Sequence, residues 1–235
     1  MTGLLPRPLP DSVVLPVGFD DDRLDTPAVL VDLDVVDTNI RRMSEFARRA
    51  GFSLRPHIKT HKSLAMAQRQ LAAGASGLAV ATTAEAVVMA RSGVTDLLLA
   101  YPTIEPRKLI RVAPLVEAGL LTFVSDSPEA THGYSELAGH LDRTIPVLVE
   151  VDTGMDRVGV EPSHVLKAAQ EIATSPGLQF RGVMTHAGHA HNATGARGIE
   201  LVARHEASVM SMVREDLETA GLDFDVVSAL SLIHI

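Results

Sequence analysis

Short apolar runs alternate with amphipathic segments along most of the chain. The runs are rich in leucine and β-branched residues, as expected for strands buried in a parallel sheet. Eight of them follow one another, at residues 28–33, 52–56, 77–80, 97–101, 121–124, 146–152, 180–186 and 224–228. Strands that alternate with helices are typical of βα units. The pattern therefore predicts eight parallel strands.

The segments between these runs carry helical periodicity. In one segment, apolar residues recur every three or four positions and a glycine follows as a stop: Val36, Ile40, Met43, Ala47 and Gly51. A later segment has the same spacing between flanking prolines and a glycine: Pro162, Val165, Ala169, Ile172, Pro176 and Gly177. Both patterns predict amphipathic helices. A further helix is expected around 106–118, where Pro114 should end or kink it.

Eight strands and seven or eight helices in 235 residues fit a (β/α)8 TIM-like barrel better than a doubly wound open sheet. A barrel of this length is usually one domain. Residues 1–26 contain three prolines before residue 16 and are predicted to form an extended arm. The barrel is expected over 27–229, and residues 230–235 form an atypical tail.

Composition excludes several classes of protein. Hydrophobic residues make up 46% of the chain and aromatic residues only 3%, which predicts an aliphatic core. The net charge of −8, without a long basic stripe, argues against a nucleic-acid partner. The absence of cysteine excludes a disulfide framework and a cysteine nucleophile. Because neither a signal peptide nor a membrane-spanning apolar run is recognisable, we expect a soluble, cytoplasmic protein.

Residues whose side chains could take part in binding or catalysis follow several of the predicted strands. They are His57, Lys59, Tyr101, Asp152, Arg157, the histidines between 186 and 191, and Ser228. In a parallel barrel the carboxyl ends of the strands all meet at one face, and active sites lie there. The sequence therefore predicts an active site at this face.

The basic run RPHIKTHKS, residues 55–63, is open to three interpretations. It is a solvated turn if its lysines and histidines simply face water, as most such side chains do. It contributes to a metal site if His57 and His61, spaced four apart, act as ligands. The pair His189 and His191, in HAGHAH, is equally suited to such a site. Zinc hydrolases combine histidine ligands of this kind with a carboxylate and an activated water.

The third interpretation makes Lys59 an imine-forming residue. A lysine at a barrel strand end can be desolvated and placed beside other cations, which lowers its pKa and frees the amine to attack a carbonyl. Arg55, His57 and Lys62 are the candidate neighbours in the sequence.

Four stretches carry a resemblance to a known family: TPAVLVDLDVVDTNIRRM, LRPHIKTHKS, VLVEVDTGMDRVGV and RGVMTHAGHAHN. In this order and spacing they resemble the fold-type III pyridoxal-phosphate enzymes, which share the barrel of alanine racemase. The P-H-x-K-T-H-K and H-A-G-H motifs are most similar to the branch of D-serine dehydratase and D-threonine aldolase. The resemblance covers about residues 26–228.

The resemblance implies roles for individual residues. Lys59 stands where the family lysine forms an imine with pyridoxal 5'-phosphate. Arg157 matches the arginine that reaches the phenolic-oxygen side of the cofactor; a structural ion pair with Asp152 or Glu150 is the alternative. His186 matches a histidine packed near the pyridine ring.

Two further positions are weaker matches. His189 is a candidate for the ring edge or the substrate, although a strand-end histidine satisfied by hydrogen bonds is an equal alternative, and for His191 this alternative is preferred. Ser228 corresponds to the start of a phosphate-binding segment, where hydroxyl and backbone N–H donors suit an anion. The alternative is that Ser228 is simply a polar residue at the end of a strand.

The implied reaction is that of a D-amino-acid lyase. A small D-amino acid displaces Lys59, the cofactor ring accepts the negative charge at Cα, and the released Lys59 removes the α-proton. Loss of the β-hydroxyl, as in D-serine dehydratase, gives a 2-oxo acid and ammonia. It is preferred over the aldolase reaction, which gives glycine and an aldehyde. A pyridoxal-phosphate homeostasis protein, which only binds the cofactor, and a metal hydrolase are further alternatives.

The chain also departs from the family pattern. Family members carry a β-rich domain after the barrel, which supplies the ligands of a divalent metal that assists at the β-hydroxyl. We expect that domain and those metal ligands to be missing from this chain, which stops at Ile235. The tail 230–235 lacks the small-residue loop expected after Ser228, which indicates a truncated or artificially joined end. Full-length relatives are expected to form homodimers.

Overall fold

The computed structural model describes residues 27 and 29–230. Its sheet contains six strands: β1 Leu78–Val80, β2 Leu97–Leu99, β3 Leu121–Ser125, β4 Ile145–Val151, β5 Leu178–His186 and β6 Val226–Leu230. Each strand pairs in parallel with the next one in the chain, so the sheet order is the sequence order. The predicted arm, 1–26, and the tail after Leu230 lie outside the described residues.

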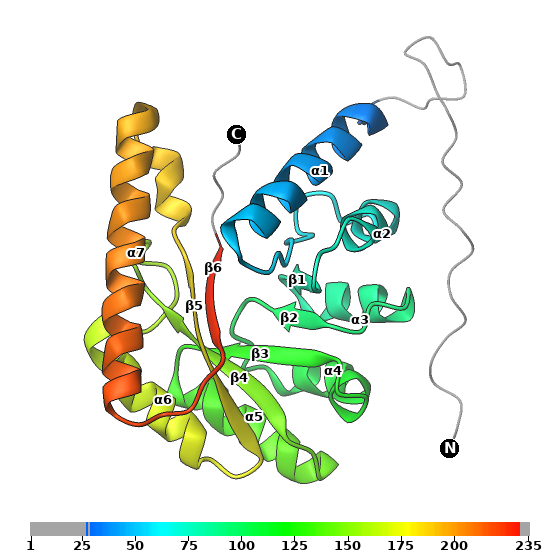
Figure 1. Cartoon of the computed structure of the whole chain (residues 1–235). Coiled ribbons are helices and arrows are strands. Elements are labelled where there is room, and N and C mark those ends of the chain that lie inside the picture. Colours follow the sequence, from blue (N-terminus) through cyan, green and yellow to red (C-terminus); the bar gives the residue numbers. More distant parts are fainter. Residues whose placement is uncertain (1–26, 28, 231–235) are drawn as a thin grey trace.

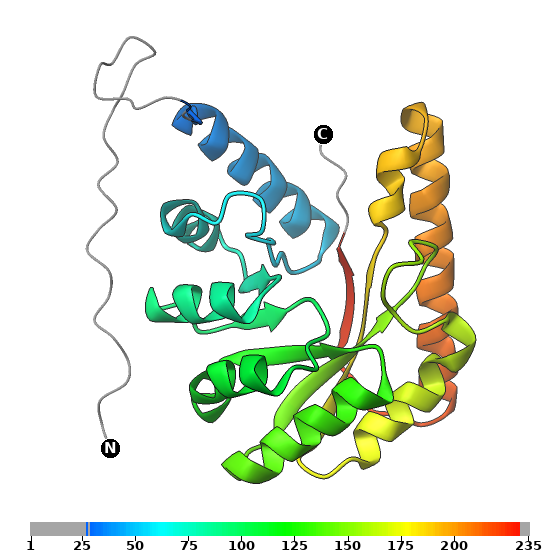
Figure 2. The ribbon, with the colours of Figure 1, turned by 180° about the vertical axis from the view of Figure 1, so that it is seen from behind.

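Helices cover the outer side of this curved sheet (Figures 1 and 2). They are α1 Leu33–Ala50, α2 Leu64–Ala72, α3 Thr83–Arg91, α4 Pro106–Glu117, α5 Pro128–Leu141, α6 Val165–Thr174 and α7 Gly195–Thr219, with short 3-10 turns η1 Pro162–His164 and η2 Gly188–Asn192. The predicted α/β barrel architecture is thus confirmed in the form of a curled half-barrel. Within the described ranges, no helix has the length and hydropathy needed to cross a membrane.

The strands bury side chains on both faces. Leu97 and Leu99 belong to the large core between sheet and helices, where Phe123 and Tyr134 also meet with ring centroids 4.7 Å apart. Successive strand residues point to opposite faces. The alternate residues form a second, smaller cluster on the inner face: Ala79, Leu98, Ala100, Val124, Leu148 and Met184. Both faces of the sheet are therefore apolar, which explains the continuous apolar runs in the sequence.

Six of the eight predicted strands are confirmed, and the first two are not. The stretch 52–56 leads into a segment that only runs beside β1. Ala79 N donates to Pro56 O at 2.8 Å, and Ile58 N donates to Ala79 O at 3.0 Å. The pairing is limited to one isolated bridge between His57 and Ala79. The chain therefore passes β1 in an extended form that is too short to count as a strand.

The predicted strand at 28–33 is wrong. Leu33 already begins α1, because the Asp32 carboxylate accepts hydrogen bonds from Asp34 N and Val35 N at 3.0 and 3.1 Å. An aspartate in this position is a favourable N-cap and fixes the start of a helix. Residues 29–32 are exposed and form no strand in the described part of the chain.

The helix predictions are confirmed. α1 ends at Gly51, whose φ of 76° gives the left-handed C-cap that glycine allows. α6 begins at Val165, after the turn opened by Pro162. Pro114 does not end α4, which continues to Glu117. Since Pro114 lies on the exposed side of the helix, the carbonyl that loses its partner has access to water.

Candidate active site

Polar side chains gather at the carboxyl ends of the strands. Lys59 follows the His57 bridge beside β1, Tyr101 follows β2, Arg157 lies in the loop after β4, and His186 is the last residue of β5. Burial is the main cause of the lowered pKa values of Lys59 and His186, and the charge of Arg157 lowers both of them further. The structure therefore brings together the three main residues that the sequence proposed.

Lys59 is half-buried, and its amine has a lowered pKa. Burial is the main cause, and the positive charge of Arg157 adds to it, whereas Glu85 acts in the opposite direction. The sequence neighbours Arg55 and Lys62 were expected to lower this pKa, but they form ion pairs with Asp96 and Glu85 instead. A lower pKa increases the fraction of neutral, nucleophilic amine.

His57 fixes the backbone that carries Lys59. Its Nδ1 accepts a hydrogen bond from Lys59 N at 3.2 Å, so in the neutral ring the proton is on Nε2. Burial, followed by the charge of Lys59, lowers the pKa of His57 to about 4. His57 is therefore neutral near physiological pH and acts as a backbone acceptor beside the amine.

Arg157 stacks on Tyr101, with its guanidinium carbon 5.9 Å from the ring centroid, the outer range of a cation–π contact. The alternative partner Asp152 is used elsewhere. Its carboxylate accepts backbone N–H bonds from three residues of the same loop, Gly154, Met155 and Asp156. Asp152 thus shapes the loop, and Arg157 is held over an aromatic ring beside Lys59.

His186 is only 5% exposed and is fixed by one hydrogen bond. Its Nδ1 lies 2.8 Å from the carbonyl oxygen of Leu230. A carbonyl can only accept, so Nδ1 carries the proton and Nε2 of the neutral ring is left as an acceptor. Burial is the main cause of the lowered pKa of His186, and the charges of Lys59 and Arg157 lower it further. The ring is therefore held neutral.

The loop after β5 packs tightly on the loop after β4. A methyl group on Gly188 would lie 2.7 Å from the Met155 sulfur and 2.9 Å from His186 Nε2. A methyl group on Gly154 would lie 3.6 Å from His189 Nε2. Glycine thus allows the close approach at position 188. The His189 ring lies beside Gly154, and its Nδ1 is buried and unpaired among the described residues. Its role toward a ligand stays a prediction.

Ser228 lies apart from this group. The strand β6 continues to Leu230, so Ser228 is its middle residue and not its last. It pairs with Met184 of β5. A strand terminus was predicted here, and this placement is wrong. Ser228 lines a cavity of about 270 Å³ at the opposite end of the half-barrel, where strands β3 and β6 begin at Leu121 and Val226. Its proposed contact with a cofactor phosphate stays a prediction.

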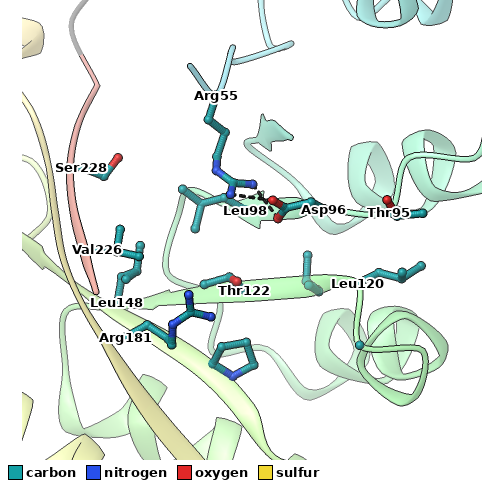
Figure 3. A pocket seen from close by; sticks show the side chains of 13 residues that line it. Arg55, Thr95, Asp96, Leu98, Leu120, Thr122, Leu148, Arg181, Val226 and Ser228 are labelled. Atoms are coloured by element: carbon teal, nitrogen blue, oxygen red, sulfur yellow. Dashed lines mark hydrogen bonds and ion pairs between the residues drawn. The ribbon is translucent and has the colours of Figure 1, made fainter. Parts of the chain in front are cut away.

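The ion pair of Arg55 with Asp96 lines the same cavity, together with the side chain of Arg181 (Figure 3). Arg55 donates to both carboxylate oxygens of Asp96, at 2.7 and 2.8 Å. Arg181 occupies a register shift between β4 and β5 and donates through Nε to Asp225 at 2.6 Å. The arginines are neutralised by these partners, and this end of a parallel barrel serves stability rather than catalysis.

The sequence interpretation missed the importance of Glu150. This residue of β4 is 3% exposed, and its Oε2 has no hydrogen-bond partner in the described structure. Burial raises its pKa to about 7, against the opposing charge of Arg157. The available signal was an acidic residue inside the otherwise apolar stretch 146–151, since a charged side chain is rarely buried unless it is paired.

Glu85 was missed for a different reason. It is the third residue of α3, and the pattern Thr-x-x-Glu from Thr82 is typical of a capping box at a helix start. In the structure its Oε1 lies 2.6 Å from Lys62 Nζ, and its Oε2 accepts from Ala81 N at 2.8 Å. The local pattern explains the residue without revealing its long-range partner.

The histidine pairs do not extend to a metal site. Across the described residues, no group of three or more His, Asp or Glu side chains is placed to hold a metal ion. A zinc site needs at least three protein ligands. The geometry defines an α/β barrel protein with a half-buried lysine of lowered pKa at its strand ends.

The chain belongs to the family of the alanine racemase N-terminal domain, whose family model matches residues 31–231. It is 35% identical to D-threo-3-hydroxyaspartate dehydratase of Delftia sp. (strain HT23) and 30% identical to D-threonine aldolase of Arthrobacter sp.. These matches cover 87% and 88% of the chain but only 54% and 55% of the relatives.

A solved structure gives the same result. The crystal structure of D-threonine aldolase from Filomicrobium marinum matches with a TM-score of 0.84 and 30% identity, over 87% of this chain and 56% of that one. The family resemblance predicted from the motifs is thereby confirmed. The chain spans about half the length of the relatives it matches.

Proposed function

We propose that this chain is the cofactor-binding barrel of a pyridoxal-phosphate-dependent lyase for β-hydroxy D-amino acids. The observation that carries the proposal is the half-buried amine of Lys59, whose pKa is lowered at the strand ends beside Arg157. The relatives support the reaction class, since they are a dehydratase and an aldolase whose names specify hydroxylated D-amino acids.

The residues at this face fit pyridoxal phosphate. Lys59 offers an amine for its aldehyde, and Arg157, held over Tyr101, offers a cation for its phenolic oxygen. His186 presents a fixed, neutral ring to one side. When bound, the cofactor supplies an electron sink for the negative charge at the substrate Cα.

Lys59 is also suited to move the α-proton. Its lowered pKa keeps part of the population as free amine, which can accept a proton at Nζ. The Lys59 backbone is fixed by the His57 ring, so the amine extends from a defined position. The nearby charge of Arg157 favours return of that proton, because it disfavours the ammonium form.

Elimination is the reaction we place first. In this reaction D-serine loses its α-proton and β-hydroxyl, and hydrolysis of the product gives pyruvate and ammonia. Retro-aldol cleavage is the second candidate, because the matched solved structure is a D-threonine aldolase; it converts D-threonine into glycine and acetaldehyde. The divalent metal, the homodimer and the cytoplasmic location stay predictions.

Product analysis tests the proposal. The chain is incubated with pyridoxal phosphate and D-serine, L-serine or D-threonine, and pyruvate, 2-oxobutanoate, glycine and acetaldehyde are quantified. We expect any turnover of a D-isomer to be lost in Lys59→Ala and kept in Lys167→Ala, the matched control on the exposed side of α6. Turnover that is equal in Lys59→Ala would contradict the proposal. Glycine from D-threonine, without 2-oxobutanoate, would decide for the aldolase.

A further inference from the structure

Lys62 is the part of the basic run that the proposed function does not use. Its φ of 48° lies in the left-handed region, which costs a non-glycine residue on the order of 1 kcal/mol. Its Nζ lies 2.6 Å from Glu85 Oε1, although its side chain is mostly exposed. A strained backbone position joined to a buried acid indicates a local constraint on residues 57–63, here called the lysine turn.

Glu85 is fixed on both of its oxygens. Its side chain is 10% exposed, Oε1 faces Lys62, and Oε2 accepts from Ala81 N, directly after β1. Its own N–H donates to the Thr82 hydroxyl at 3.2 Å. Because its carboxylate is bound to the residue after β1 and its backbone N–H to the N-cap of α3, Glu85 gives the lysine turn a rigid point of attachment.

The turn is closed internally as well. Lys62 N donates to Ile58 O at 2.8 Å, and Ile58 is fully buried. Lys59 lies between these two residues, with its N–H on the His57 ring. A displacement of Lys62 would therefore be transmitted to Lys59 through one turn of backbone.

The same acid acts on the Lys59 amine through its charge. Arg157, from the loop after β4, lowers the pKa of Lys59, and Glu85, from α3, raises it. The imidazoles of His57 and His186, the other titratable groups facing this amine, are themselves affected by its charge. Lys62 neutralises part of the Glu85 charge, so it determines how far that charge raises the pKa of Lys59.

We propose that the Lys62–Glu85 ion pair is a positioning device for Lys59, which holds the lysine turn in place and balances the charge of Glu85 next to the amine. The inference rests on the proposed function, since it concerns the same lysine. Lys62 and Glu85 are positioning residues, because their contacts are with the turn and not with a reacting group.

Two substitutions separate this role from general support of the fold. Lys62→Asn removes the cation but suits the left-handed backbone, which asparagine tolerates. It leaves Glu85 unbalanced, so the pKa of Lys59 should rise. Glu85→Gln removes the anion and leaves Lys62 charged, so the pKa of Lys59 should fall. A merely structural role would move both variants in the same direction.

The pKa can be measured without cofactor. The cofactor-free chain is labelled with trace acetic anhydride across a pH series, and each of its four lysines is quantified by peptide mass spectrometry. Lys108 and Lys167, on the outer helices, serve as internal references. We expect Lys59 labelling at neutral pH to fall about threefold in Lys62→Asn and to rise about threefold in Glu85→Gln. Shifts in the same direction, or none, would overturn the inference.

Two controls keep the result interpretable. Lys62→Arg retains the cation and should restore wild-type labelling of Lys59. Urea unfolding of each variant confirms that it is folded at the labelling conditions, and labelling is compared only between folded chains. Opposite shifts in a chain that takes up no pyridoxal phosphate would support the ion-pair role and count against the proposed function. Uptake of pyridoxal phosphate with unshifted labelling of Lys59 in both variants would support the proposed function and overturn the role of the ion pair.

Discussion

The Nδ1 atom of His186 lies 2.8 Å from the carbonyl oxygen of Leu230, and this contact joins the last residues of β5 and β6. The proton on Nδ1 is fixed by the carbonyl, so Nε2 remains available at the strand ends. One nitrogen of His186 thus supports the sheet edge, and the other is left without this contact at the candidate site.

Two substitutions of His186 separate these tasks. Asparagine can still donate to Leu230 O, whereas alanine cannot, and loss of this bond should cost about 1 kcal/mol of unfolding free energy. We expect His186→Asn to unfold in urea near the wild-type midpoint and His186→Ala at a lower one. Both should bind pyridoxal phosphate more weakly, as measured by absorbance titration. Unchanged cofactor affinity in both variants would contradict the placement of His186 beside the cofactor.

Gly188 allows the two site loops to meet. In Gly188→Ala the new methyl group would overlap the Met155 side chain and crowd His186 Nε2. Because the end of the Met155 side chain is flexible and can move aside, we expect a loss of about 1 kcal/mol in the free energy of urea unfolding, the lower end of the usual cost of overpacking. Gly139→Ala, on α5 with no atom within 4 Å of the new methyl group, is the control and should be neutral or slightly stabilising. Equal unfolding of the two variants would refute the close packing.

The raised pKa of Glu150 predicts a pH dependence of stability. The pKa of Glu150 in the folded chain is about 7, above its ordinary value of 4.5. Protonated Glu150 therefore contributes fully to the free energy of unfolding below pH 4.5, and this contribution is lost as pH rises through about 7. The glutamine variant has no such ionisation. As pH rises between these two values, the free energy of unfolding of Glu150→Gln should therefore increase relative to that of wild type by on the order of 1–3 kcal/mol.

The measurement is a series of urea unfolding curves over pH. His57 acts in the opposite direction, because its pKa is depressed to about 4, and stability is lost as pH falls from about 6.5 through that value. The difference between wild type and Glu150→Gln cancels this histidine contribution. Glu161→Gln, an exposed substitution, should leave the curve unchanged. A constant difference between wild type and Glu150→Gln at all pH values would show that Glu150 does not titrate in this range.

Regular elements were predictable where the pattern was long or buried on both faces. α1 has helical spacing over many residues and a glycine stop, and β2 and β4 are mostly apolar runs. The run at 28–33 looks like a strand, but Asp32 caps a helix within it. The predicted strand at 224–228 ends two residues too early, because the small residue Ala229 does not indicate that β6 continues to Leu230.

The grouping of Lys59, Arg157 and His186 was predictable from the sequence, whereas their contacts and the position of Ser228 were not. Lys59, Arg157 and His186 follow strands, and the barrel brings strand ends together. The cation next to Lys59 was sought among its sequence neighbours, yet it comes from Arg157 in another loop. The Lys62–Glu85 pair joins residues that are 23 positions apart, which periodicity and capping patterns cannot reveal.

The most direct test of the central claim is the site of covalent attachment of pyridoxal phosphate. The chain is mixed with the cofactor, reduced with borohydride and digested, and the modified lysine is identified by mass spectrometry in wild type, Lys59→Ala and Lys167→Ala. The account predicts one main adduct, on Lys59, in wild type and Lys167→Ala, and its loss in Lys59→Ala. An adduct spread evenly over the four lysines, or one that persists in Lys59→Ala, would contradict it.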